Sequence, residues 1–329
     1  MVFKRLLGSL GVGGPSVDTV LDPGAVTPGG SLTGEIRLKG GGAEFEVEHL
    51  TLELLARVEA ETDDGEYDGT VVFERFTVGG GFRLGEDEER TLPFAFSVPW
   101  ESPLTELHGQ PLGIALGLRT ELAVAGARDK GDLDPVAVRP LPVQEAILEA
   151  FGRQGFGFRS ADLEYGRIGG TGQQLPFYQE IELTPSPRFA HAVSEIEVTF
   201  LATSGGLEVV LEADKRGGGH DAVTRFTVGL HGVEQTDWDA EVDGWVRHLV
   251  EHRAAFGAHG GHGPYGHHGD HSDHHEGHRS GPGMGTAVAA GAAGLAVGVA
   301  GGMVAAEIVD EVGDFFEGDE DEEDGGEEG

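Results

Sequence analysis

The stretch SLTGEIRLKG, residues 31–40, carries the pattern that decides the fold. Leu32, Ile36 and Leu38 share one side of an extended chain, and the polar residues between them take the other side. Successive side chains of a β-strand point to opposite faces, so apolar and polar residues that alternate indicate a strand with one buried face. The stretch therefore predicts a β-strand that lies on a hydrophobic core.

The same alternation recurs along the first 138 residues, with Gly, Pro and Asp at the interruptions, as reversals of chain direction require. A glycine-rich stretch, GGGFRLG at residues 79–85, is interpreted as a hairpin turn because it leads to charged turn residues and another strand. Strands at this spacing favour a β-sandwich over alternating strands and helices. Six strands are predicted, in residues 16–22, 31–40, 49–61, 70–79, 90–100 and 113–126.

The strand-like sequence pattern ends at DPVAVRPLPVQEAILEAFG, residues 134–152, where three prolines precede a short helical pattern. This stretch predicts a domain junction with a helix at about residues 142–151. Strand-like patterns resume beyond it and predict a second sandwich of similar size, so the two sandwich domains are placed at residues 1–133 and 134–235. The second set of strand patterns covers residues 159–166, 175–185, 194–216 and 222–230.

A second helical pattern follows the second sandwich, at residues 236–256. Trp238, Val242, Trp245 and Leu249 recur at intervals of four, three and four, which predicts an amphipathic helix packed on the body. Thr236, with an acid three positions later, is expected to cap the helix as a variant of the capping box. Beyond this helix we expect no folded domain: residues 257–285 are a His/Gly-rich disordered linker, 286–306 a Gly/Ala-rich apolar segment and 307–329 an acidic disordered tail.

The opening of the chain resembles a known family. LLGSLGVGGPSVDTVLDPGAVTPGGSLTGEIRLKGG contains a basic-apolar start, a V-D-T-x-L strand and a P-G-x-x-x-x-G-x-x-x-[IL] segment. These features resemble bacterial sporulation-control proteins of the stage-zero M type. LPFYQEIELTP, residues 175–185, and the helix of Trp238 and Trp245 resemble later parts of the same family.

The resemblance implies a mainly β fold of two arrestin-like β-sandwich domains, followed here by one amphipathic helix and the low-complexity extension. It also implies a cytoplasmic, non-enzymatic adaptor that requires no cofactor and affects sporulation or cell development by binding proteins. Nothing in the resemblance extends to the long C-terminal extension or identifies the partners.

Charge and composition exclude several other classes. The formal net charge is −36, and the last 23 residues carry 13 acids and no base, which leaves 45 acids against 22 bases upstream. Such a chain repels nucleic acids and anionic lipids, so we expect no nucleic-acid partner. The absence of cysteine rules out disulfides, thiolate metal sites and cysteine nucleophiles.

The histidine-rich tract HGGHGPYGHHGDHSDHHEGH, residues 259–278, suggests an alternative function in divalent-metal binding or metal response. Imidazole is a common metal ligand, and pairs of these histidines have chelating spacings. The surrounding glycines and Pro264 provide no rigid scaffold, so we interpret the tract as a spacer that binds Zn or Ni weakly and adaptably. The candidate ligands are His259, His262, His267, His268, His271, His274, His275 and His278.

A second metal hypothesis rests on HLVEH, residues 248–252, which matches the H-x-x-E-H pattern of inverted zinc peptidases. On a helix, His248 and His252 could share a zinc ion, with Glu251 as the base. Such enzymes need a further acidic ligand from downstream helices, and the downstream sequence is glycine, histidine and alanine. We therefore favour the solvent side of the amphipathic helix for these residues and predict no enzyme.

Two apolar segments leave membrane contact open. Residues 286–306 are 21 residues without a charge, and Gly294, Gly298 and Gly302 recur every fourth residue, as in a self-associating or membrane-contacting glycine zipper. A flexible hydrophobic linker is the alternative, because Ala, Val and glycine dominate the segment. The N-terminal MVFKRLLGSLGVGG is expected to pack on the body, with a weak membrane-touching anchor as its alternative.

Overall fold

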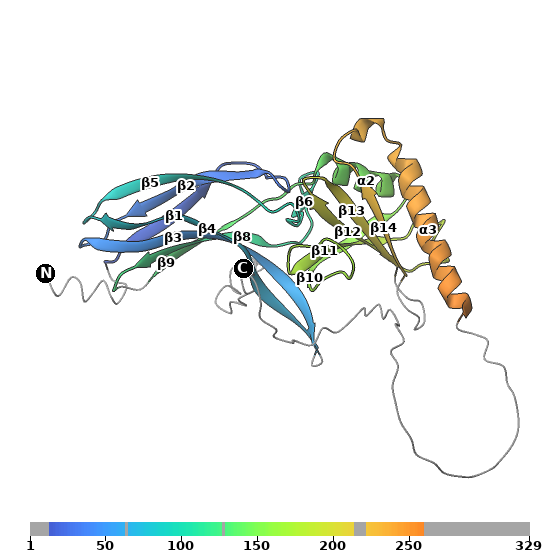
Figure 1. Ribbon diagram of the computed structural model, residues 1–329, viewed down its shortest axis with the longest axis horizontal. Helices are drawn as coiled ribbons and strands as arrows, with labels where there is room; N and C mark the ends of the chain where they lie inside the picture. Colours follow the sequence, from blue (N-terminus) through green and yellow to red (C-terminus); the bar gives the residue numbers. More distant parts are fainter. Residues whose placement is uncertain (1–12, 63–64, 127–128, 214–221, 260–329) are drawn as a thin grey trace, which may run out of the picture.

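The computed structural model describes residues 13–62, 65–126, 129–213 and 222–259. Two β-rich halves lie side by side along the long axis, and helices α2 (Pro142–Arg153) and α3 (Trp238–His259) accompany the second half (Figure 1). The predicted mainly β fold with a closing amphipathic helix is confirmed.

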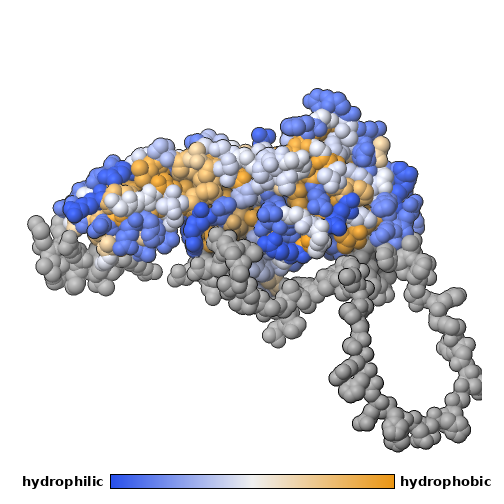
Figure 2. All heavy atoms as spheres, viewed as in Figure 1, coloured by the Kyte–Doolittle hydropathy of each residue, from blue (hydrophilic) through white to orange (hydrophobic). Residues whose placement is uncertain are grey.

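The first half is a sandwich of two antiparallel layers. One layer has the order β1-β2-β5 and faces strands β3, β4, β8 and β9 of a larger sheet. Leu32, Ile36 and Leu38 of β2 are buried between the layers, as their alternation predicted. Phe76 stacks on Phe96 across the layers with ring centroids 3.9 Å apart, and hydrophobic residues gather over β2 and β5 (Figure 2). The strands are β1 (Ser16–Leu21), β2 (Ser31–Lys39), β3 (Phe45–Thr62), β4 (Gly65–Leu84), β5 (Glu89–Ser97), β8 (Leu116–Val124) and β9 (Lys130–Pro135).

The interpretation of GGGFRLG as a hairpin turn is wrong. Residues 79–84 belong to β4, where Gly79 lies opposite Leu50 and Leu84 opposite Phe45. Gly80 serves a close approach between strands: a Cβ there would lie 2.3 Å from the carbonyl oxygen of Glu48. Glycine inside a strand is typical of such an approach. The sequence indicated a turn instead because glycine is also a common turn residue.

Strand β9 was not predicted, because KGDLDP contains a single large apolar residue. Its strand conformation comes from pairing with β8, in which Leu118 lies opposite Asp134 and Leu122 opposite Lys130. A tertiary partner, not the local pattern, therefore decides its structure.

The second half is an antiparallel meander with helices on its apolar face. Helix α2 confirms the helix predicted near residue 142, and Pro142 occupies its first turn. Phe226 of β14 stacks on Trp245 of α3 with centroids 4.9 Å apart, and the predicted stripe of α3 is buried. The strands are β10 (Gly157–Tyr165), β11 (Phe177–Thr184), β12 (Ile196–Thr203), β13 (Gly206–Ala213) and β14 (Ala222–Val228).

The cap of α3 differs from the expectation. Asp237, not Thr236, caps the helix: the backbone N–H of Ala240 donates to Asp237 Oδ1 at 3.1 Å. The Thr236 hydroxyl instead donates to the carbonyl oxygen of Gly232 at 3.3 Å. The helix follows a 3₁₀ turn at Val233–Gln235, which shifts the capping position by one residue.

The two halves share one sheet. Its strand order is β14-β13-β12-β11-β10-β3-β8-β9, with β4 on the other edge of β3. The sheet continues from one half to the other through a parallel pairing of β3 with β10, in which Glu59 lies opposite Glu164. The Gln179 side chain adds a clamp, since its amide accepts from the N–H of Leu104 at 2.8 Å and donates to the Leu104 carbonyl at 2.9 Å. The boundary between residues 133 and 134 remains a prediction and falls inside β9.

Candidate functional site

A small hairpin at the junction of the halves presents a histidine to helix α2. Strands β6 (Glu106–Leu107) and β7 (Gln110–Pro111) are joined by two residues, His108 and Gly109. Both have positive φ angles, 52° and 74°. Two such residues in succession are the requirement of a type I′ hairpin turn. The turn therefore fixes the backbone from which the imidazole of His108 extends.

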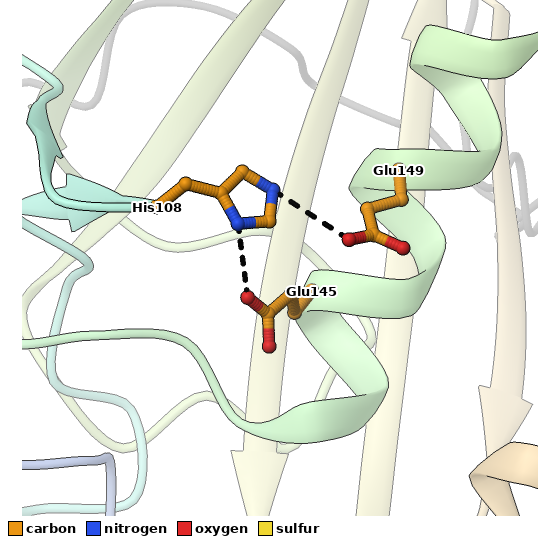
Figure 3. Close-up of side chains that lie close together, drawn as sticks. All are labelled: His108, Glu145 and Glu149. Carbon is orange, nitrogen blue, oxygen red and sulfur yellow. Dashed lines mark ion pairs between the residues drawn. The ribbon is translucent and has the colours of Figure 1, made fainter.

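The imidazole lies between two carboxylates of α2 (Figure 3). Its Nδ1 is 3.1 Å from Glu145 Oε1, and its Nε2 is 3.7 Å from Glu149 Oε1. Glu145 and Glu149 are four residues apart and so share one face of the helix. The three side chains are about half exposed. One imidazole with two carboxylates can form an ion pair or offer three ligands to a metal ion.

An apolar pocket of about 230 Å³ adjoins this cluster. The cluster residues His108 and Glu149 line it together with aromatic and aliphatic side chains of both halves. Phe158 also lines it and is 48% exposed, unusual for a phenylalanine in a folded domain. The pocket lies between the hairpin, α2 and the first strands of the second half.

A larger open groove, about 510 Å³, borders the same hairpin. Glu106 and Pro111 line it, and these two residues lie opposite one another in the hairpin. Leu107, the next residue, lines the apolar pocket instead. Because neighbouring strand residues point to opposite faces, the hairpin separates the two hollows. The rest of the groove comes from the segments around β8 and β9, including Ile114, Ala115, Val136 and Ala137.

Carboxylates cluster on the sheet of the second half. One carboxylate oxygen each from Asp162, Glu164 and Glu180 lies within 4.8 Å of the others. Burial, followed by the charges of Glu197 and the cluster, raises the pKa of Glu180 to about 9. Burial, with Glu59 as the largest charge contribution, raises the pKa of Asp162 to about 6. Burial and the same carboxylates raise the pKa of the Tyr178 hydroxyl. This face is therefore short of positive charge.

The sites predicted from sequence lie elsewhere. His259 is the last residue of α3, and the other seven histidines of the tract fall outside the described residues, as do Gly294, Gly298 and Gly302. The metal-binding role of the tract therefore stays a prediction. No helix in the described part of the chain has the length and apolar content to cross a membrane.

The HLVEH residues lie on α3 as expected. The rings of His248 and His252 are 6.0 Å apart, and Leu249 between them is buried. Within residues 13–259, where described, neither histidine joins a cluster of three potential metal ligands. The further acidic ligand that a zinc peptidase needs is thus not found beside them in the described structure.

Sequence reasoning missed the cluster at the junction. Glu145 and Glu149 gave a usable signal, since their spacing places two acids on one helical face. His108–Gly109 gave another, because glycine after a short polar residue is typical of a type I′ turn. Nothing in the sequence indicated that this turn and this helix meet.

The family of the chain follows from comparison with known proteins. The family described as "SpoOM protein" matches residues 3–217, about two thirds of the chain. The chain belongs to this family. The match includes the first half and the second half as far as β13, but not β14, α3 or the C-terminal extension.

A comparison of sequences and a comparison of structures agree with this assignment. The sporulation-control protein spo0M of Bacillus subtilis (strain 168) is 34% identical over 218 residues, which cover 66% of this chain and 82% of that protein. The crystal structure of Spo0M from Bacillus subtilis superimposes with a TM-score of 0.62 at 28% identity, and the match covers 73% of this chain and 99% of that one. The resemblance inferred from the first 41 residues is confirmed, and the chain is a Spo0M-like sporulation-control protein.

Proposed function

We propose that this SpoOM-family protein is a non-enzymatic adaptor, which acts in sporulation control by binding protein partners in the open groove beside its junction hairpin. The single observation that supports this choice is the position of the groove. It has a volume of about 510 Å³ and is bordered by the junction hairpin and the ends of β8 and β9.

The lining of the groove suits an apolar segment of a partner. Its side chains are mainly aliphatic, with Thr105 and Glu106 as the polar side chains among those that border it. A protein segment binds such a surface by burying apolar side chains, while polar groups fix its orientation. A single carboxylate without a second titratable group in the lining is a poor basis for acid–base catalysis.

The backbone around the groove is held by contacts that suit binding of a partner without large rearrangement. The shared sheet and the Gln179–Leu104 clamp join the halves. Val26 also bridges Val138 next to the groove, and the N–H of Val26 donates to the carbonyl oxygen of Ala137 at 2.9 Å. A preformed site loses less conformational entropy on binding than a flexible one.

The test is partner capture from a lysate of the native host with three baits: the parent chain, Ala137→Arg and Ala95→Arg. Ala137 is exposed in the groove lining, whereas Ala95 is exposed on β5, so both variants add the same charge and bulk. We expect Ala137→Arg to lose partners that Ala95→Arg retains. Equal retention by all baits would contradict binding in the groove. Partners that are released when a chelator is added would show that their binding depends on a metal ion.

A further inference from the structure

We propose that His108, Glu145 and Glu149 form a binding site for a divalent first-row transition ion, with Zn²⁺ as the probe. The site is distinct from the histidine tract at residues 259–278. It is also independent of the adaptor function proposed above, because it requires no partner protein.

The donor set matches the chemistry of such ions. Zinc takes imidazole nitrogen and carboxylate oxygen at about 2.0–2.2 Å, and the imidazole favours a transition ion over Ca²⁺ or Mg²⁺. The 3.1 Å between His108 Nδ1 and Glu145 Oε1 is the separation expected of two adjacent ligands on one ion. One donor atom from each of the three residues lies within 4.8 Å of the others. Because the two carboxylates face different ring nitrogens, an ion on Nδ1 beside Glu145 requires the half-exposed Glu149 side chain to turn toward it.

The scaffold is fixed on both sides. The type I′ turn holds the backbone of His108, and α2 is anchored by buried Val143, Ile147 and Phe151. The Arg153 guanidinium donates from Nη1 to Glu149 Oε2 at 3.3 Å. It thus contacts the oxygen that does not face the imidazole and orients the carboxylate, as outer partners of metal ligands do.

The local charge attracts a cation. The carboxylates of Glu145 and Glu149 face the imidazole, and the one guanidinium that contacts them, that of Arg153, leaves an excess of negative charge. The formal net charge of −36 adds a field that attracts cations to the whole molecule.

An ion here would tie the β6–β7 hairpin to α2. Glu106 and Pro111 of that hairpin line the groove, so the ion would fix one wall of the proposed partner site. This consequence, unlike the site itself, rests on the proposed function.

The experiment uses the full chain with the eight tract histidines replaced by Gln, which removes their competing zinc binding. Isothermal titration with ZnCl₂ is run on this chain and on three further variants of it: His108→Asn, Glu145→Gln and His252→Gln. Asn tolerates the left-handed backbone at position 108, so the first variant removes the imidazole and keeps the turn. His252→Gln tests the competing pair of histidines on α3.

We expect a zinc-binding event whose affinity falls at least about tenfold in His108→Asn and in Glu145→Gln, and is unchanged in His252→Gln. Circular dichroism of each variant establishes that it is folded. A fourth variant, Glu149→Gln, leaves the hairpin unaltered and is expected to weaken the same zinc-binding event. No zinc binding by the tract-substituted chain would overturn the proposal. Zinc binding that His108→Asn and Glu145→Gln leave unchanged would also overturn it. No partner protein enters the measurement, so failure of the adaptor proposal would leave this result standing.

Discussion

Glu59 of β3 lies directly opposite Glu164 of β10, and this parallel pair carries the sheet of one half into the other. Asp162 and Glu180 lie beside Glu164, so several carboxylates meet where the halves join. Like charges across a sheet are destabilising. Apolar burial and backbone hydrogen bonds therefore hold the junction against this repulsion.

Stability should fall as the pH rises at this junction. Burial, then Glu197, raises the pKa of Glu180 from 4.5 to about 9. Between these values the folded state binds more protons than the unfolded state, so the free energy of unfolding decreases with rising pH. Glu180→Gln, which is neutral throughout, should reduce this dependence and raise the melting temperature at pH 8. Melting curves from pH 5 to 9 test this, with exposed Glu44→Gln as a control that should keep the parent's slope.

Glu53 should be indispensable to the first half. Its side chain is fully buried, and its two oxygens accept from Arg75 Nε at 2.5 Å and Arg119 Nε at 2.7 Å. Glu53→Gln leaves both guanidinium groups short of a counter-charge, which should reduce the free energy of unfolding by roughly 3 kcal/mol. Urea denaturation measures the loss. A change as small as that of Glu44→Gln, whose partner Arg83 is also exposed, would show that the arginines find other partners.

Gly29 should tolerate no side chain. A Cβ there would lie 2.5 Å from the ring of Trp100, and the φ angle is +70°. Gly81 has nearly the same φ, +67°, but has no atom within 4 Å of its Cβ position. Gly81→Ala should cost about 1–2 kcal/mol for the left-handed backbone alone, and Gly29→Ala distinctly more. Equal losses in thermal unfolding would mean that Trp100 moves aside without cost.

The cap of α3 gives a direct comparison between sequence and structure. Asp237→Ala removes the acceptor of the Ala240 N–H and should cost about 1 kcal/mol. Thr236→Ala removes only a long, exposed hydrogen bond to Gly232 and should cost much less. Chemical denaturation of the two variants decides between them, and the reverse order would restore Thr236 as the cap.

The sequence predicted what local pattern determines. Alternation located β2 and most other strands, because their apolar faces are buried, and the spacing of Trp238, Val242 and Trp245 located the buried stripe of α3. KGDLDP became β9 through its partner β8, and GGGFRLG became strand because glycine permits close approach to β3. Neither cause is visible in the local pattern.

The cluster of His108, Glu145 and Glu149 could not be predicted from the sequence for the same reason. The separate signals of a His-Gly turn and of two acids four residues apart were present, but their meeting depends on how the halves are joined. The seven carboxylates and the tyrosine hydroxyl that interact on β3 and β10–β13 were also missed, because cross-strand register brings them together.

Sharing β3 between the halves has a consequence for the order of folding. Beyond Ala56, where its pairing with β8 ends, the described neighbours of β3 are β4 and β10. Synthesis delivers β10 only after the whole first half. Until then, residues 58–62 of β3 present an unpaired edge, which is an available template for another chain. A nascent or truncated chain that ends before Gly157 should therefore be more prone to aggregation than the full-length protein.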